Sequence, residues 1–173
     1  MLKSFMLRII FTFYILFINL LIANEPTLAI LRNINSNEMQ EFNIGNYNFY
    51  CHPYGVVTLE RLYNNSKKGS LCQKSIETLH KLNPDLKYLA HKSLFLEQRY
   101  HIGFKKTLCI LYSNGQLTWS ENLLKRGAAI LKPRFNDEEF VHSFQQAEFS
   151  AKTKKDGLWA SDIQKNCISE LSF

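Results

Sequence analysis

The stretch Leu108-Cys109-Ile110-Leu111-Tyr112-Ser113-Asn114-Gly115 indicates the fold more clearly than any other part of the chain. Its first five residues are apolar or aromatic, which is typical of a strand. The Asn-Gly pair that follows is typical of a tight hairpin turn, because Asn and Gly both tolerate positive φ angles. Residues 116–119 are then expected to form the returning strand, so we predict a β-hairpin here.

Patterns on both sides of this hairpin predict further strands and helices. Residues 26–52 alternate short apolar stretches with Asn, Ser and Gly-Asn, which predicts two or three antiparallel strands joined by tight turns. Asn83-Pro84-Asp85 supplies the cap and first-turn residues of a helix. Farther on, we expect a short helix over residues 121–126 and a last helix that begins after Asn136 and stops at Gly157. Together these elements predict an α+β fold.

Length and composition exclude several classes of protein. The chain has 173 residues, of which 46% are hydrophobic, so one compact domain is expected rather than a disordered chain. Only 7 Gly and 4 Pro occur, which excludes collagen-like and low-complexity architectures, and no sequence repeat is visible. The formal net charge of +6 favours anionic partners only weakly.

The first residues have the pattern of a secretory signal. Lys3 and Arg8 precede an apolar run from Ile9 to Ala23, which is shorter than the roughly 20 residues of a membrane-spanning helix. We expect cleavage after Ala23, so that residues 1–23 are the signal and residues 24–173 form one domain. This domain would be periplasmic or secreted and would have no transmembrane segment. The alternative is an uncleaved N-terminal anchor, which leaves the domain in the same compartment.

All four cysteines follow the expected signal, so they lie where disulfides can persist. Four cysteines allow three pairings. We favour Cys51 with Cys72, which closes a local loop, and Cys109 with Cys167, which fixes the tail to a core strand. A metal site is disfavoured because close ligand pairs such as Cys-x-x-Cys are absent.

Three segments of the last third of the chain follow one another in a characteristic order. They are the strand and Gly turn over residues 108–115, the helix pattern over residues 121–129 with Gly127, and residues 147–152 followed by Gly157-Leu158-Trp159. Their order and spacing resemble the thermonuclease (staphylococcal nuclease-like) family. The resemblance implies a five-stranded OB-fold β-barrel with about three helices.

The resemblance also implies calcium-dependent cleavage of phosphodiesters, in which carboxylates hold the metal and two Arg residues neutralise the phosphate. This chain departs from that pattern. Asn35-Ser36-Asn37-Glu38 stands where the family has an Asp-rich turn, and residues 50–58 replace a stretch that carries Arg and Asp in the family. Amides in place of carboxylates remove most of the charge that attracts a divalent ion. We therefore expect no metal and no other cofactor.

Three residues near the altered motifs are the weak candidates for catalysis. Glu38 and Glu60 could act as substitute ligand or general base, because each lies close in sequence to a changed motif. Lys106 takes the place of the second family Arg, where it keeps the charge but loses the bidentate geometry. Neither Glu matches the family pattern residue by residue.

A second group of residues is the candidate site for nucleic acids or other anions. Lys105 and Lys106 have His101 and Phe104 nearby in the sequence, and cations beside aromatic rings can contact phosphates and stack on bases. Phe135 aligns near a Tyr that lines the nucleotide pocket in the family's best-known member. The alternative for the two lysines is a solvated strand end without a ligand.

The metal-binding and phosphate-binding motifs of the family are altered in this chain, whereas the segments that build its scaffold are kept. We therefore favour an exported thermonuclease-like domain whose nuclease site is degenerate and which acts as a non-catalytic binding module. Its partner would be a nucleic acid or an envelope protein or polymer. The alternative is an active secreted nuclease with a rearranged site built from Glu38, Glu60 and Lys106, and only this alternative requires calcium.

Overall fold

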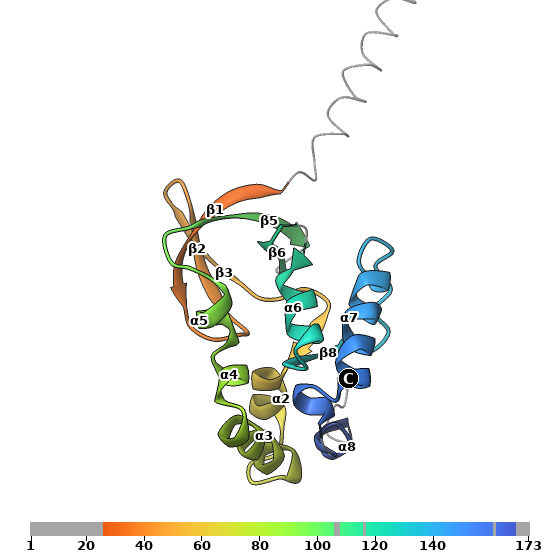
Figure 1. Ribbon diagram of the computed structural model, residues 1–173. Coiled ribbons are helices and arrows are strands. Elements are labelled where there is room, and N and C mark those ends of the chain that lie inside the picture. The colour runs from red at the N-terminus through yellow and green to blue at the C-terminus, as the bar shows by residue number, and fades with distance from the viewer. Residues whose placement is uncertain (1–25, 106–107, 116, 161, 169–173) are drawn as a thin grey trace, which may run out of the picture.

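The computed structural model describes residues 26–105, 108–115, 117–160 and 162–168. These residues form eight strands, seven α-helices and one 3-10 helix, so the prediction of an α+β fold is confirmed. Figure 1 shows the strands β1, β2, β3 and β5 gathered at one end, with α3 and α8 at the opposite end. The expected signal, residues 1–23, lies outside the described residues.

The main sheet has six antiparallel strands in the order β3-β2-β1-β5-β6-β7. The opening meander and the predicted hairpin are both present, although the returning strand β7 is short because helix α6 begins at Trp119. The strands are β1 (Thr27–Ile34), β2 (Gln40–Ile44), β3 (Tyr47–Cys51), β5 (Arg99–Lys105), β6 (Leu108–Asn114) and β7 (Leu117–Thr118). One face of this sheet forms much of the core, since Leu31, Phe42 and Ile102 are fully buried.

Among the strands that the structure describes, the sheet is not closed into a barrel, which corrects the expectation of a five-stranded OB-fold β-barrel. Beyond β3, the chain meets β6 at an isolated parallel bridge between Pro53 and Cys109. The Cys109 backbone N–H donates to the His52 carbonyl at 3.1 Å. Pro53 has no N–H group with which a ladder could continue, so the pairing stops there.

A two-stranded sheet and the helices build the rest of the domain. Strand β4 (Val56–Thr58) pairs with β8 (Ala129–Leu131). The helices are α2 (Leu59–Asn65), α3 (Leu71–Leu82), α4 (Pro84–Lys87), α5 (Leu89–Ser93), α6 (Trp119–Lys125), α7 (Val141–Lys154), the 3-10 helix η1 (Gly157–Trp159) and α8 (Ile163–Ile168). The expectation of about three helices was too low, in part because the helix predicted after Asn83 is divided into α4 and α5 at Tyr88.

The last long helix begins later than the sequence predicts. Helix α7 starts at Val141 rather than just after Asn136. The Asp137 carbonyl accepts the backbone N–H groups of Phe140 and Val141 at 3.1 and 2.8 Å, and the Asp137 side chain accepts that of Glu139 at 3.0 Å. Asp137 therefore forms a turn of its own before the helix, as Asp side chains readily do.

The disulfides join Cys51 to Cys109 and Cys72 to Cys167, so the favoured pairing of Cys51 with Cys72 and Cys109 with Cys167 is wrong. The sheet brings the end of β3 beside β6, whereas Cys72 and Cys167 lie on α3 and α8 at the far end of the molecule (Figure 1). Both bridges connect distant parts of the chain, with sequence separations of 58 and 95 residues. Local loop closure was therefore a poor guide to the pairing.

Two of the three segments that carry the family resemblance contact each other. The Leu158 backbone N–H donates to the Gly127 carbonyl at 3.0 Å. A Cβ atom on Gly127 would lie 2.2 Å from the Asp156 carbonyl oxygen, and Gly127 has a φ of +61°. Only glycine allows this approach without displacement of the backbone, so the contact fixes the end of α6 against η1.

Candidate functional site

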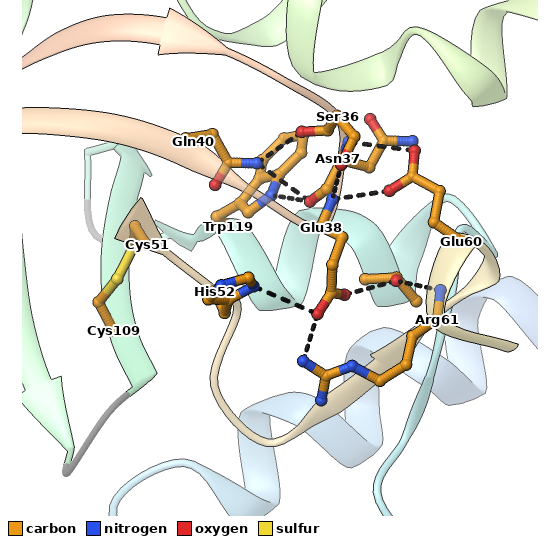
Figure 2. Close-up of polar contacts among 11 residues, drawn as sticks. Ser36, Asn37, Glu38, Gln40, Cys51, His52, Glu60, Arg61, Cys109 and Trp119 are labelled. Carbon is orange, nitrogen blue, oxygen red and sulfur yellow. Dashed lines mark hydrogen bonds and ion pairs between the residues drawn. A yellow bond between two sulfur atoms is a disulfide. The ribbon is translucent and has the colours of Figure 1, made fainter. Parts of the chain in front are cut away.

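Asn37, in the turn between β1 and β2, is the centre of a buried polar network (Figure 2). Its side-chain amide donates to the Leu86 carbonyl at 2.8 Å, and its Oδ1 accepts the backbone N–H of Ala90 at 2.8 Å. Its own carbonyl accepts hydrogen bonds from Trp119 Nε1 at 3.0 Å and Gln40 Nε2 at 3.1 Å. The side-chain oxygen of Asn37 and its backbone carbonyl oxygen therefore both connect the β1–β2 turn to the helices: Oδ1 to α5 and the carbonyl to α6.

Glu60, in the first turn of α2, holds the same turn from the other side. Its Oε1 accepts the Asn37 backbone N–H at 3.2 Å, and its Oε2 accepts the Glu38 backbone N–H at 2.8 Å. Burial raises the pKa of the Glu60 carboxyl, although these backbone hydrogen bonds act in the opposite direction. The carboxylate of Glu60 therefore serves as an acceptor for the turn.

Glu38 points from the turn toward two donors, Thr58 and Arg61, with His52 nearby (Figure 2). Thr58 Oγ1 donates to its Oε2 at 2.6 Å, and its Oε1 pairs with Arg61 Nη2. His52 Nδ1 lies 3.5 Å from the same Oε1. The Thr58 hydroxyl also accepts the Arg61 backbone N–H at 3.1 Å and so caps α2.

The geometry brings Glu38 and Glu60 to the same turn, and every oxygen of the two carboxylates already contacts a donor of the protein. A divalent cation would have to replace Arg61 and the backbone N–H groups, all of which oppose positive charge. Across the described ranges, no group of three or more His, Cys, Asp or Glu side chains is arranged to hold a metal ion. The cluster orders the turn and α2, and its Arg61 guanidinium supplies positive charge where a metal site needs excess negative charge.

Lys105, the first candidate for anion binding, forms two ion pairs within the protein. Its Nζ lies 3.2 Å from Glu139 Oε2 and 3.5 Å from Asp137 Oδ2. The hydrogen bond to Glu139 raises the pKa of Lys105. Tyr54 donates its hydroxyl to Asp137 at 2.8 Å, which fixes one of these carboxylates. An incoming phosphate would meet two carboxylates around this single cation.

The other candidates for anion binding are not gathered into one aromatic and basic surface. His101 is exposed on β5 and shares a face of that strand with Lys105, whereas Phe104 lies on the opposite face against Phe49, with ring centroids 5.3 Å apart. Phe135 is only partly buried, but its ring contacts core aromatics: its centroid lies 5.3 Å from that of Tyr54 and 5.4 Å from that of Phe144. Lys106 lies outside the described residues.

Several residues of the cluster were not identified as site residues from the sequence. Arg61, Thr58 and Asn37 come from three elements, and Arg61 contacts a carboxylate 23 residues away. His52 directly follows Cys51, whose disulfide with Cys109 leaves no free thiol beside it. The Thr58-x-x-Arg61 spacing shows a helix N-cap, but nothing in the sequence indicates where Glu38 will lie.

Comparison with known proteins leaves the family open: no protein-family model matches the chain, and no curated protein gives a significant match. The resemblance to thermonucleases therefore depends on the segments over residues 108–115, 121–129 and 147–159. In the described part of the chain, no helix has the length and apolar character needed to cross a membrane. The two disulfides are typical of proteins in oxidising compartments.

Proposed function

We propose that this protein is an exported, non-catalytic binding module built on a thermonuclease-like OB scaffold whose nuclease centre is degenerate. The observation that carries the proposal is the occupation of both candidate carboxylates by internal donors. Glu60 accepts two backbone N–H groups, and Glu38 contacts Thr58, Arg61 and His52. A cation at either carboxylate would also meet the Arg61 guanidinium or the backbone N–H groups, whose positive charge opposes its binding.

The strand connectivity supports the OB scaffold. Five strands follow the order β3-β2-β1-β5-β6, and the parallel bridge between Pro53 and Cys109 brings the two ends of this order together. OB folds are five-stranded, partly open barrels of this kind. The Cys51–Cys109 disulfide supplies a covalent link where the hydrogen-bonded ladder is interrupted.

The surroundings of Lys105 favour an envelope protein or polymer over a nucleic acid as the partner. Nucleic acid binding relies on cations that can replace counterions on phosphates. Lys105 is paired with Asp137 and Glu139, so it is a weaker phosphate contact than a free lysine.

The test is incubation of the purified, oxidised protein with single- and double-stranded DNA and RNA, with calcium or with a chelator. We expect no cleavage that depends on calcium. Cleavage that the chelator stops and that Glu60→Ala abolishes would replace this proposal by the active nuclease with a rearranged site.

Binding of a labelled oligonucleotide at several salt concentrations then distinguishes the partners. A nucleic-acid module should lose affinity linearly in a plot of log affinity against log salt, and Lys105→Gln should reduce the slope. We expect weak binding with no effect of Lys105→Gln. Tight, salt-sensitive binding that depends on Lys105 would assign nucleic acid as the ligand.

A further inference from the structure

A separate cavity of about 550 Å³ lies between α2, β8, α7, η1 and α8, away from the Glu38 cluster. Its volume is within the range of small-molecule sites. Helix α2 separates the two places: Leu59 and Leu62 face the cavity, while Glu60 contacts the turn before β2. Most of the lining is apolar: Leu59, Leu62, Ile130, Leu131, Pro133, Leu158, Trp159, Ile163 and Cys167.

The charged lining residues leave one cation unbalanced. Glu148 Oε2 pairs with Lys152 Nζ at 2.6 Å, and Glu148 Oε1 accepts the Leu131 backbone N–H at 2.9 Å. Lys152 also lies over the Trp159 ring, with its Nζ 4.5 Å from the centroid. Glu148 and Lys152 therefore neutralise each other at the cavity wall.

Arg134 is the remaining charge of the lining. It is exposed, and among the residues that the structure describes no carboxylate lies within ion-pair distance of it. Its φ of +60° is in the left-handed region, which is unfavourable for a long side chain and is ordinarily filled by Gly or Asn. A guanidinium with no ion-pair partner in the described ranges thus lies at a strained backbone position beside an apolar cavity.

From this arrangement we infer that the cavity binds a small amphipathic anion, with an apolar chain against Leu131 and Trp159 and a carboxylate that pairs with Arg134. The apolar walls favour transfer of a hydrocarbon chain from water. A guanidinium can meet a carboxylate with two parallel hydrogen bonds, so it recognises the head group. This site does not depend on the proposed function of the scaffold.

The probe is decanoate, titrated into the purified, oxidised protein by calorimetry, with decanol as the neutral ligand of matched chain length. We expect saturable binding of decanoate below about 1 mM and binding of decanol at least about tenfold weaker. Trp159 emission should change on binding, and this change should be lost in Trp159→Phe while the heat of binding remains.

Variants of Arg134 test whether its guanidinium binds the carboxylate of decanoate. Arg134→Gln should weaken decanoate binding at least about tenfold, and Arg134→Lys should restore part of it. Lys132→Gln is the matched control, because Lys132 is an exposed cation two residues away that does not line the cavity. Arg134→Gly removes the strained side chain, so the thermal midpoint should not fall although binding is lost.

Three results would overturn the inference. They are no saturable binding of decanoate, equal affinities for decanoate and decanol, and unchanged affinity in Arg134→Gln that folds normally. Binding of an apolar peptide amide without binding of decanoate would also overturn it and would assign a peptide groove.

Discussion

The carboxylate of Glu60 accepts the backbone N–H of Glu38 at 2.8 Å, so the two acidic residues nearest to the altered motifs are connected within the fold. In a metal centre, such side chains would direct their oxygens toward a shared cation. Here Glu60 directs its oxygens toward the turn that carries Glu38, and Glu38 directs its own toward Arg61 and Thr58 (Figure 2). The contacts that stabilise the turn are the reason to expect no catalysis.

Replacement of Glu60 by Gln should destabilise the protein. Gln keeps the shape of the side chain but presents an amide N–H to one of the two backbone donors, which leaves that donor unpaired. We expect the free energy of unfolding at neutral pH to fall by about 1–3 kcal/mol, measured by urea denaturation. Glu138→Gln is the control, because Glu138 is exposed. If Glu60→Gln and Glu138→Gln are equally stable, the Glu60 carboxylate does not stabilise the turn.

Stability should depend on pH through Glu60. Burial raises the pKa of this carboxyl, so the folded protein binds the proton more tightly than the unfolded chain does. The contribution of Glu60 to the free energy of unfolding therefore increases as the pH falls from the raised pKa toward the ordinary value of 4.5, and it is lost as the pH rises through the same interval.

Urea denaturation of wild type and Glu60→Gln at several pH values isolates this effect. The free energy of unfolding of the wild type, minus that of the variant, should become more positive as the pH falls from neutral to about 4.5. A difference that stays constant or decreases on acidification would mean that the pKa of Glu60 is not raised.

The disulfide pairing predicts which cysteines become free on mutation. After denaturation without reductant, Cys51→Ala should show Cys109 reactive toward a thiol reagent, and Cys72 and Cys167 should stay protected in their disulfide. Removal of the Cys51–Cys109 bridge by the double Ala variant should cost about 2–5 kcal/mol of unfolding free energy. Peptide mapping without reductant gives the pairing directly, and a Cys51–Cys72 peptide would contradict the structure.

Gly127 should tolerate no side chain. Ala at this position would place a Cβ 2.2 Å from the Asp156 carbonyl oxygen at a φ of +61°. Gly45 is a matched control, because its φ is +59° but nothing lies within 4 Å of an added Cβ. Gly45→Ala should cost about 1 kcal/mol of unfolding free energy from the backbone angle alone. Gly127→Ala should cost clearly more, and equal thermal midpoints would argue against the close contact.

Local patterns predicted several of the local elements correctly. The Asn114-Gly115 turn does join β6 to a returning strand, and helix α6 occurs close to its predicted place. Helix α6 begins at Trp119, two residues before its predicted start, because Thr118 caps it and forms a capping box with Glu121. That Thr-x-x-Glu pattern is present in the sequence and could have placed the helix start correctly.

Contacts between distant segments were not predictable in the same way. The disulfide partners and the Glu38–Arg61 pair depend on which strands and helices lie side by side. A single sequence does not show which distant segments contact each other. Asp137 and Glu139 lie in the turn before α7, where they pair with Lys105 at the end of β5. Glu38 and Glu60 were candidates from the sequence, whereas their contacts with Arg61, Thr58 and the backbone of the turn became visible only in the structure.

Calorimetric titration of calcium into the oxidised protein tests the central claim most directly. Because every oxygen of Glu38 and Glu60 already contacts an internal donor, we expect no saturable heat of binding at calcium concentrations up to about 1 mM, the weak end of extracellular calcium sites. Saturable binding in this range that is lost in Glu60→Gln would contradict the account and would make the cluster a metal site.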